Sequence, residues 1–196
     1  MGSFVFLPEQ NRTYTASVES GGKTKSLRLP LSEEGLTVSA TQSADSICLV
    51  IRSTNIQPEQ ISIIGQSRHS VCYALDGVRR NEIEEVVIPK NKFPTGIAQF
   101  TLFKEGKPVS ERLIFIDRKD DLKIEMVPDK NEYGDREKIR LAMKVTDETG
   151  KPVEGSFSLS VTDDKVVSPS IDVHNIKGSL LLEADLKGYI ENAGWY

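Results

Sequence analysis

Residues 129–163 read DKNEYGDREKIRLAMKVTDETGKPVEGSFSLSVTD. The stretch contains two segments in which apolar and polar residues alternate, separated by a polar turn with Gly and Pro. The apolar members are Ile139, Leu141, Met143 and Val145 in the first segment and Phe157, Leu159 and Val161 in the second. A side-chain period of two is typical of a half-buried antiparallel strand, whereas a helix would scatter these residues around its axis. We therefore predict two strands of a β-sandwich here.

Similar runs, separated by short turn signals, continue along the rest of the chain, as in all-β sandwiches. Strands are predicted near residues 14–18, 26–29, 37–40, 47–52, 61–64, 71–75, 85–88, 98–103, 112–116, 122–127, 139–145 and 156–162. Turns are predicted at Gly21-Gly22, Glu34-Gly35, Asp76-Gly77, Pro94-Thr95-Gly96 and Glu105-Gly106-Lys107-Pro108. The run 97–103 and the following run 112–116 predict a closing hairpin. Residues 175–186 are compatible with a short helix.

Five consecutive charged residues, Asp117 to Asp121, cannot enter a core, so they mark the predicted domain boundary. We predict two tandem antiparallel immunoglobulin-like β-sandwich domains, residues 4–117 and 120–196. Because the chain stops at Tyr196 within ordered-looking sequence, we expect the second domain to be truncated at its C-terminus. The sequence Gly-Lys-Pro-Val occurs at 106–109 and again at 150–153. Either two related domains or common turn chemistry explains this repeat.

Charge and hydropathy restrict the partners. The net charge of −4 gives no electrostatic reason to expect nucleic acid or an anionic membrane as partner. No apolar run is long enough to cross a bilayer, so we expect no membrane insertion by this segment. The first residues do not read as a signal peptide, so we expect an exported parent to carry one outside this chain. We expect a monomer.

Residues that could carry chemistry are few. His69 and His174 are the only histidines, and neither has metal-ligand spacing or an evident nucleophile partner. Residues 65–68 are interpreted as a turn rather than a phosphate-binding loop. The acidic pairs Asp120-Asp121 and Asp163-Asp164 are interpreted as solvated turn carboxylates, because a calcium site needs more ordered oxygen ligands. We therefore predict no catalytic, metal or cofactor site, and no enzymatic activity.

Other residue types leave alternatives open. Cys48 and Cys72 are interpreted as small buried thiols rather than a disulfide, because sequence does not give the Cα separation that a bridge needs. The tripeptide at 11–13 fits the N-glycosylation rule, which matters only in a eukaryotic secreted protein. Tyr189, Trp195 and Tyr196 are interpreted as core residues rather than a sugar-binding platform.

Residues 129–163 also resemble a known family, the MG2 domain of the α2-macroglobulins. The resemblance rests on Asp129-Lys130, Tyr133, the strand start at 137–139, the turn at 145–153 and the strand at 158–163. It covers about 119–196, and residues 93–97 and 111–116 resemble a neighbouring macroglobulin-like domain. The family usually has Pro-Gly after the Tyr, where this chain has Gly134-Asp135-Arg136. The family's Cys-Gly-Glu-Gln thioester is missing, so no protease-trapping residue can be carried over.

The resemblance implies a scaffold or protein-contact role. The chain also resembles exported proteins of Bacteroides-type bacteria, some of them associated with TonB-dependent receptors. We therefore expect a non-enzymatic macroglobulin-like module of a larger exported envelope protein, periplasmic or outer-membrane-associated, with a protein partner. The alternative is a carbohydrate-binding or adhesin-type sandwich, and a hydrolase is a third reading. Grouped aromatics in a groove would favour the sugar alternative, a Ser or Cys–His–carboxylate arrangement the enzyme, and an exposed sheet edge the scaffold.

Overall fold

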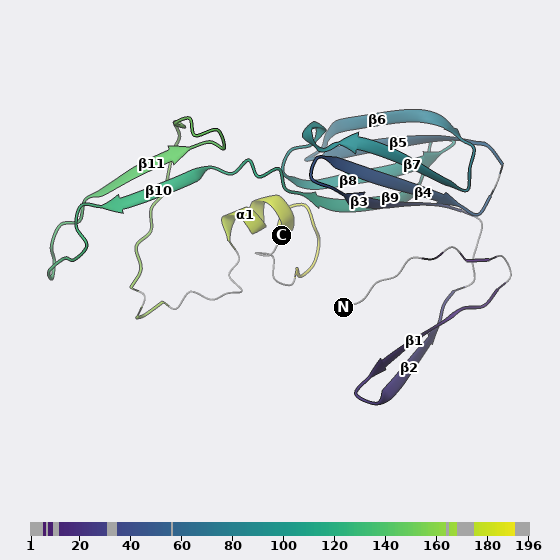
Figure 1. The fold of residues 1–196 in the computed structure, drawn as a ribbon, viewed down its shortest axis with the longest axis horizontal. Coiled ribbons are helices and arrows are strands. Elements are labelled where there is room, and N and C mark those ends of the chain that lie inside the picture. The colour runs from purple at the N-terminus through teal and green to yellow at the C-terminus, as the bar shows by residue number, and fades with distance from the viewer. Residues whose placement is uncertain are drawn as a thin grey trace. The chain divides into compact units, whose positions relative to one another are not determined.

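The computed structural model of this 196-residue chain describes residues 6, 8–9, 12–30, 35–55, 57–163, 165–167 and 175–190. Strands dominate the described residues, which confirms the predicted all-β class (Figure 1). The strands are β1 (Thr15–Ser20), β2 (Lys23–Arg28), β3 (Leu36–Gln42), β4 (Ser46–Ser53), β5 (Glu59–Ser67), β6 (Ser70–Arg79), β7 (Ile83–Pro89), β8 (Gly96–Lys104), β9 (Lys107–Ile116), β10 (Lys123–Pro128) and β11 (Leu141–Thr146). A 3-10 turn η1 (Lys90–Lys92), helix α1 (Ile176–Gly178) and π-helical turn η2 (Ser179–Glu183) complete the elements.

The strands form four sheets. A three-stranded sheet has the order β3-β4-β7, and a four-stranded sheet has the order β6-β5-β8-β9. The hairpins β1-β2 and β10-β11 are separate antiparallel two-stranded sheets. We refer to the three-stranded and four-stranded sheets together as the sandwich.

The hydrophobic core lies between the two sheets of the sandwich. Every second residue of β4 is buried, as are alternate residues of β5 and β8. The buried side chains from these three strands include Ile47, Leu49, Ile51, Ile61, Ile63, Phe100 and Leu102. The strands predicted near 47–52, 61–64 and 98–103 are thus present, and each buried aliphatic side chain contributes about 1.5–3 kcal/mol of transfer free energy.

The chain divides into two compact units. The first comprises Met1–Ile64, Ala74–Ile88 and Phe100–Arg112, and it contains the core just described. The second comprises Gly65–Tyr73, Pro89–Gln99 and Leu113–Tyr196. The domain boundary predicted at 117–121 stays a prediction.

Hydrogen bonds and one ion pair hold the helical segment of the second unit. The Asn175 side chain accepts a hydrogen bond from Gly178 N at 2.7 Å, which caps α1, and the short helix predicted at 175–186 is confirmed. Lys177 Nζ lies 2.6 Å from Asp121 Oδ2. Gly96 has a φ of +131°, and a Cβ there would lie 3.6 Å from the carbonyl oxygen of Leu181. A side chain at position 96 would therefore be strained by its backbone conformation.

One turn predicted from sequence lies inside a strand and another begins later than predicted. Asp76 and Gly77 belong to β6, which continues to Arg79, so the turn predicted there is wrong. Gly65 to Ser67 belong to β5, and the turn predicted at 65–68 begins only at Arg68, which has a φ of +47°. A Gly-containing segment turns only where the flanking strands end. After β6 the chain reverses at Arg80–Glu82, where the Glu84 carboxylate accepts hydrogen bonds from Arg80 N and Asn81 N at 2.7 and 3.2 Å.

The strand predicted at 156–162 is also wrong. The turn before it forms as expected, with Gly150 at a φ of +85° and a single bridge between Thr146 and Pro152. Val153 N then donates to Val145 O at 3.0 Å, and no strand follows through residue 163. Alternation specifies which face a strand would bury, but a strand exists only where a neighbouring backbone pairs with it.

Candidate functional site

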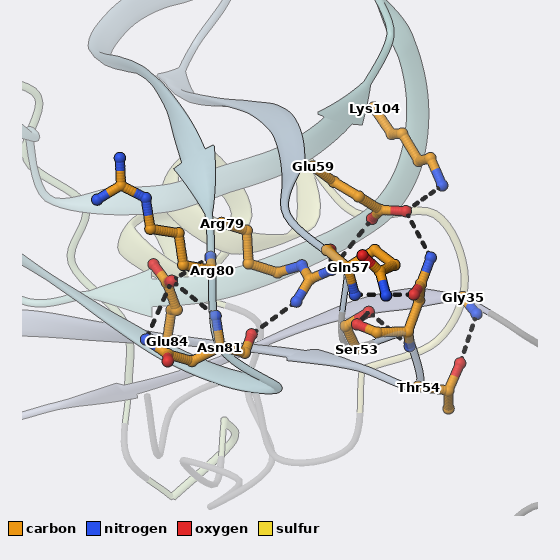
Figure 2. Close-up of polar contacts among 11 residues, drawn as sticks. Gly35, Ser53, Thr54, Gln57, Glu59, Arg79, Arg80, Asn81, Glu84 and Lys104 are labelled. Carbon is orange, nitrogen blue, oxygen red and sulfur yellow. Dashed lines mark hydrogen bonds and ion pairs between the residues drawn. The ribbon is translucent and has the colours of Figure 1, made fainter.

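A buried arginine, Arg79, lies at the end of β6. The Arg79 side chain is 0% exposed and is among the largest fully buried side chains of the described residues. Its guanidinium donates to the carbonyl oxygens of Asn81 and Gln57 at 2.7 and 2.6 Å (Figure 2). Its Nη2 also lies 3.5 Å from Glu59 Oε2. The cation thus joins the end of β6, the start of β5 and the β6–β7 turn.

The Glu59 carboxylate is the counter-charge of this network. Lys104 Nζ on β8 lies 2.6 Å from Glu59 Oε1, and Asn55 Nδ2 donates to the same oxygen at 3.2 Å. The hydrogen bond from Lys104 is the largest influence and lowers the pKa of Glu59, with smaller contributions from Arg79, against desolvation that raises it. The carboxylate therefore stays ionised and fully engaged at neutral pH.

The carboxylate of this network is held by contacts with its neighbours. A pocket of about 390 Å³ lies beside it, lined by Gly35, Leu36, Ser53, Asn55, Glu59, Lys104 and Val109. Glu59 is a poor general base because its pKa is lowered and its oxygens already accept hydrogen bonds. The Ser53 hydroxyl donates to Asn55 O at 2.9 Å and accepts from Asn55 N at 3.0 Å, so it closes a local turn. These contacts fix the loop between β4 and β5.

β3 and β9 also end their sheets, but the side that they form is partly blocked, and we call it the closed side. Val38 N on β3 donates to the Ser110 hydroxyl of β9 at 3.1 Å, so a side chain occupies one backbone donor of that edge. Pro108, near the start of β9, has no N–H to offer to a further strand. Both features oppose strand addition on this side.

The opposite side is open. β7 ends the three-stranded sheet and β6 ends the four-stranded sheet, so both strands have an unpaired edge. Large apolar side chains are exposed on these strands: Leu75 at 38%, Val78 at 47%, Ile83 at 49% and Val87 at 64%. We call these four residues together with Glu85 the open side.

A cavity of about 60 Å³ lies between β6 and β7. Its lining includes Leu75 and Val78 from β6 and Val86 from β7, and the core residues Ile51, Ile61 and Ile63 also contribute to it. Because one sheet has three strands and the other four, the inward Leu75 is left partly uncovered. A core of this kind is closed by adding a strand or covering the edge.

None of the residues singled out from sequence belongs to the open side, and several lie outside the described residues. His69 lies in the β5–β6 turn with a φ of +66°, as predicted for a turn residue. Cys48 and Cys72 are both free and half-buried. No three His, Cys, Asp or Glu side chains among the described residues form a group that could hold a metal ion. Asn11, Asp164, His174, Trp195 and Tyr196 lie outside the described residues.

The described acidic residues Asp120, Asp121 and Asp163 are exposed, as predicted, and each also makes a contact. Asp120 accepts a hydrogen bond from the Thr95 hydroxyl at 2.5 Å, and Asp121 pairs with Lys177. Asp163 accepts from Lys165 N at 2.8 Å, as a turn carboxylate does. Tyr189 is exposed, which departs from the core position predicted for it. In the described part of the chain no helix is long and apolar enough to cross a membrane.

Sequence reasoning missed both the Arg79–Glu59–Lys104 network and the open side. Arg79 lies outside the strands predicted from sequence, and nothing near it in sequence indicates burial. A strand is predicted near 85–88, but which strands end each sheet depends on the strand order. Comparison with protein-family models finds no match for the chain, and comparison with curated proteins finds no similar protein.

Proposed function

We propose that this chain is a protein-contact module whose sandwich accepts an extended segment of a partner protein at the open side. The observation that carries the proposal is the pair of unpaired strand edges with four exposed apolar side chains and a partly uncovered core. Strand addition satisfies the open backbone groups of an edge and gives alternate side chains of the partner a place to pack.

The rigidity of the edge supports this role. Arg79 anchors the end of β6 through two carbonyl oxygens, and Glu84 holds the turn that leads into β7. An edge fixed before binding loses little conformational entropy when the partner docks. The Arg79–Glu59–Lys104 network therefore serves as the support of the contact surface in this proposal.

The proposal also covers the type of parent protein and its location. The MG2-like residues in 129–163 support a macroglobulin-type scaffold, and the resemblance to exported Bacteroides-type proteins supports an envelope protein, with or without a TonB-dependent receptor. Such modules work as spacers and contact surfaces, so the role needs no catalytic group. The sugar-binding alternative gains no specific support from the described aromatic residues.

A peptide-selection experiment tests the proposal. Extended peptides are selected on the purified chain from a random library, and the bound complex is studied by hydrogen–deuterium exchange. We expect slowed exchange at the amides of β7 and binding at least about tenfold weaker, about 1.4 kcal/mol, in Val87→Lys. Val109→Lys, at an exposed valine on β9 of the closed side, is the matched control and should bind normally. Selected peptides that protect other strands, or that ignore Val87→Lys, would overturn the proposal.

A further inference from the structure

We infer that the segment accepted at the open side alternates apolar residues with a basic residue that faces Glu85. This inference rests on the proposed function and specifies the partner's chemistry. The strand β7 has an outward face and an inward face. Ile83, Glu85 and Val87 point outward and are exposed, whereas Glu84 and Val86 are half-buried and Ile88 is buried.

The outward face sets the charge pattern. A strand paired with β7 places its side chains about 5 Å from those directly opposite. Apolar residues therefore suit the positions opposite Ile83 and Val87, and Lys or Arg suits the position between them. The Glu82 and Glu85 side chains make no hydrogen bond or ion pair with other described residues, so their carboxylates are available to a partner.

The inward face sets the size of the intervening residues. Leu75 and Val86 line the cavity between β6 and β7, together with core isoleucines. At about 60 Å³ the cavity has room for the tip of a branched aliphatic side chain but not for an aromatic ring. Valine or a similar residue at the inward positions would cover Leu75 and complete the core.

The same charges disfavour a second copy of this chain as the occupant. Antiparallel pairing of β7 with β7 of another copy would bring the glutamates at 82, 84 and 85 of both copies together. Like charges on facing positions destabilise a strand pair. The open side thus favours a partner segment that carries positive charge.

Two peptides test the inference directly. Each has the core Thr-Val-Val-X-Val-Val-Thr between Gly-Ser tails, with Lys at X in one and Glu at X in the other. At low salt we expect the Lys peptide to bind about five- to tenfold more tightly by fluorescence anisotropy, with slowed exchange at β7. Glu85→Lys should reverse the preference. Glu105→Lys, the same charge change in the β8–β9 turn, should leave it unchanged.

The outcomes separate this inference from the proposed function. If both peptides bind equally and protect β7, the charge preference is overturned while strand addition stands. If library peptides protect β7 but neither designed peptide binds, the inferred pattern is overturned. If no peptide protects β7, the proposed function fails and the inference fails with it. If light scattering shows a dimer that Glu85→Lys alters, a second copy occupies the open side and the inference is overturned.

Discussion

The strands β4 and β11 both carry apolar side chains but lie in different environments. Leu49 in the middle of β4 is 0% exposed, whereas Leu141 at the start of β11 is 44% exposed. β4 lies between two strands in a sheet that faces a second sheet, and β11 pairs with β10 in a two-stranded sheet. The number of neighbouring strands and the presence of a facing sheet therefore determine whether the apolar side chains of a strand are covered.

The largest test of this comparison removes the same side chain from each strand. Leu49→Ala should lower the free energy of unfolding by about 2–5 kcal/mol, because it leaves a cavity in a closed core. Leu141→Ala should cost less than about 1 kcal/mol, because water already reaches that side chain. Urea unfolding followed by circular dichroism measures both values. Equal costs would mean that β11 is packed as tightly as β4.

The next test compares a buried cation with an exposed one. Arg79→Met should destabilise the sandwich by about 3 kcal/mol, because two carbonyl oxygens and Glu59 lose a partner in a buried setting. Lys130→Met removes the exposed ion pair with Glu137 in the loop between β10 and β11 and should have little effect. Thermal unfolding measures the difference.

A conservative variant sharpens that result. Arg79→Lys keeps the charge, but one ammonium group cannot reproduce the planar fork that reaches Asn81 O and Gln57 O together. Arg79→Lys should therefore recover only part of the loss. Full recovery would show that charge alone matters at this position and that the hydrogen-bond geometry does not.

Sequence predicted the sandwich well where local pattern and tertiary pairing agree. The strands predicted at 47–52 and 98–103 form as β4 and β8, and the β8–β9 hairpin forms at its predicted turn residues. Prediction failed at Asp76-Gly77, where strand pairing continues through a local turn signal, and at 156–162, where no neighbouring strand pairs with the alternating segment. The open side depends on which strands end each sheet. Arg79 depends on three segments that meet in space, so a single sequence gives no sign of its burial.

A third test uses pH to compare Glu59 in the sandwich with Glu137 in the loop between β10 and β11. The pKa of Glu59 is lowered in the folded protein, mainly by the hydrogen bond from Lys104. The stability that Glu59 contributes is therefore present above its unfolded pKa of about 4.3 and is lost as pH falls through the folded pKa. At neutral pH, Glu59→Gln should cost about 1.5 kcal/mol, since it weakens charge-assisted hydrogen bonds.

The pH dependence of this difference is the decisive measurement. The difference in free energy of unfolding between wild type and Glu59→Gln should shrink as the pH falls from about 4.3 through the folded pKa of Glu59. Urea unfolding at several pH values measures it. Glu137→Gln is the control. Lys130 lowers the pKa of Glu137 as well, but this carboxylate lies in the loop between β10 and β11. A gap for Glu59→Gln that stays constant with pH would contradict the role assigned to this carboxylate.

The smallest test uses the repeated Gly-Lys-Pro-Val turn. Gly106 and Gly150 have φ values of +74° and +85°, and no atom lies within 4 Å of a Cβ built on either. Alanine at either position would therefore add backbone strain of about 1 kcal/mol without a clash, and asparagine should cost less. Gly106 joins β8 to β9 within the four-stranded sheet, so Gly106→Ala should lower the free energy of global unfolding.

Gly150 joins β11 to a single bridge, so Gly150→Ala should act locally. Faster exchange of the Val153 amide, which donates to Val145 O at 3.0 Å, should report the strain, with little change in the urea midpoint. Equal loss of global stability in the two variants would show that the β10–β11 region unfolds together with the sandwich. In that case the difference in exposure between β4 and β11 would not correspond to a difference in cooperativity.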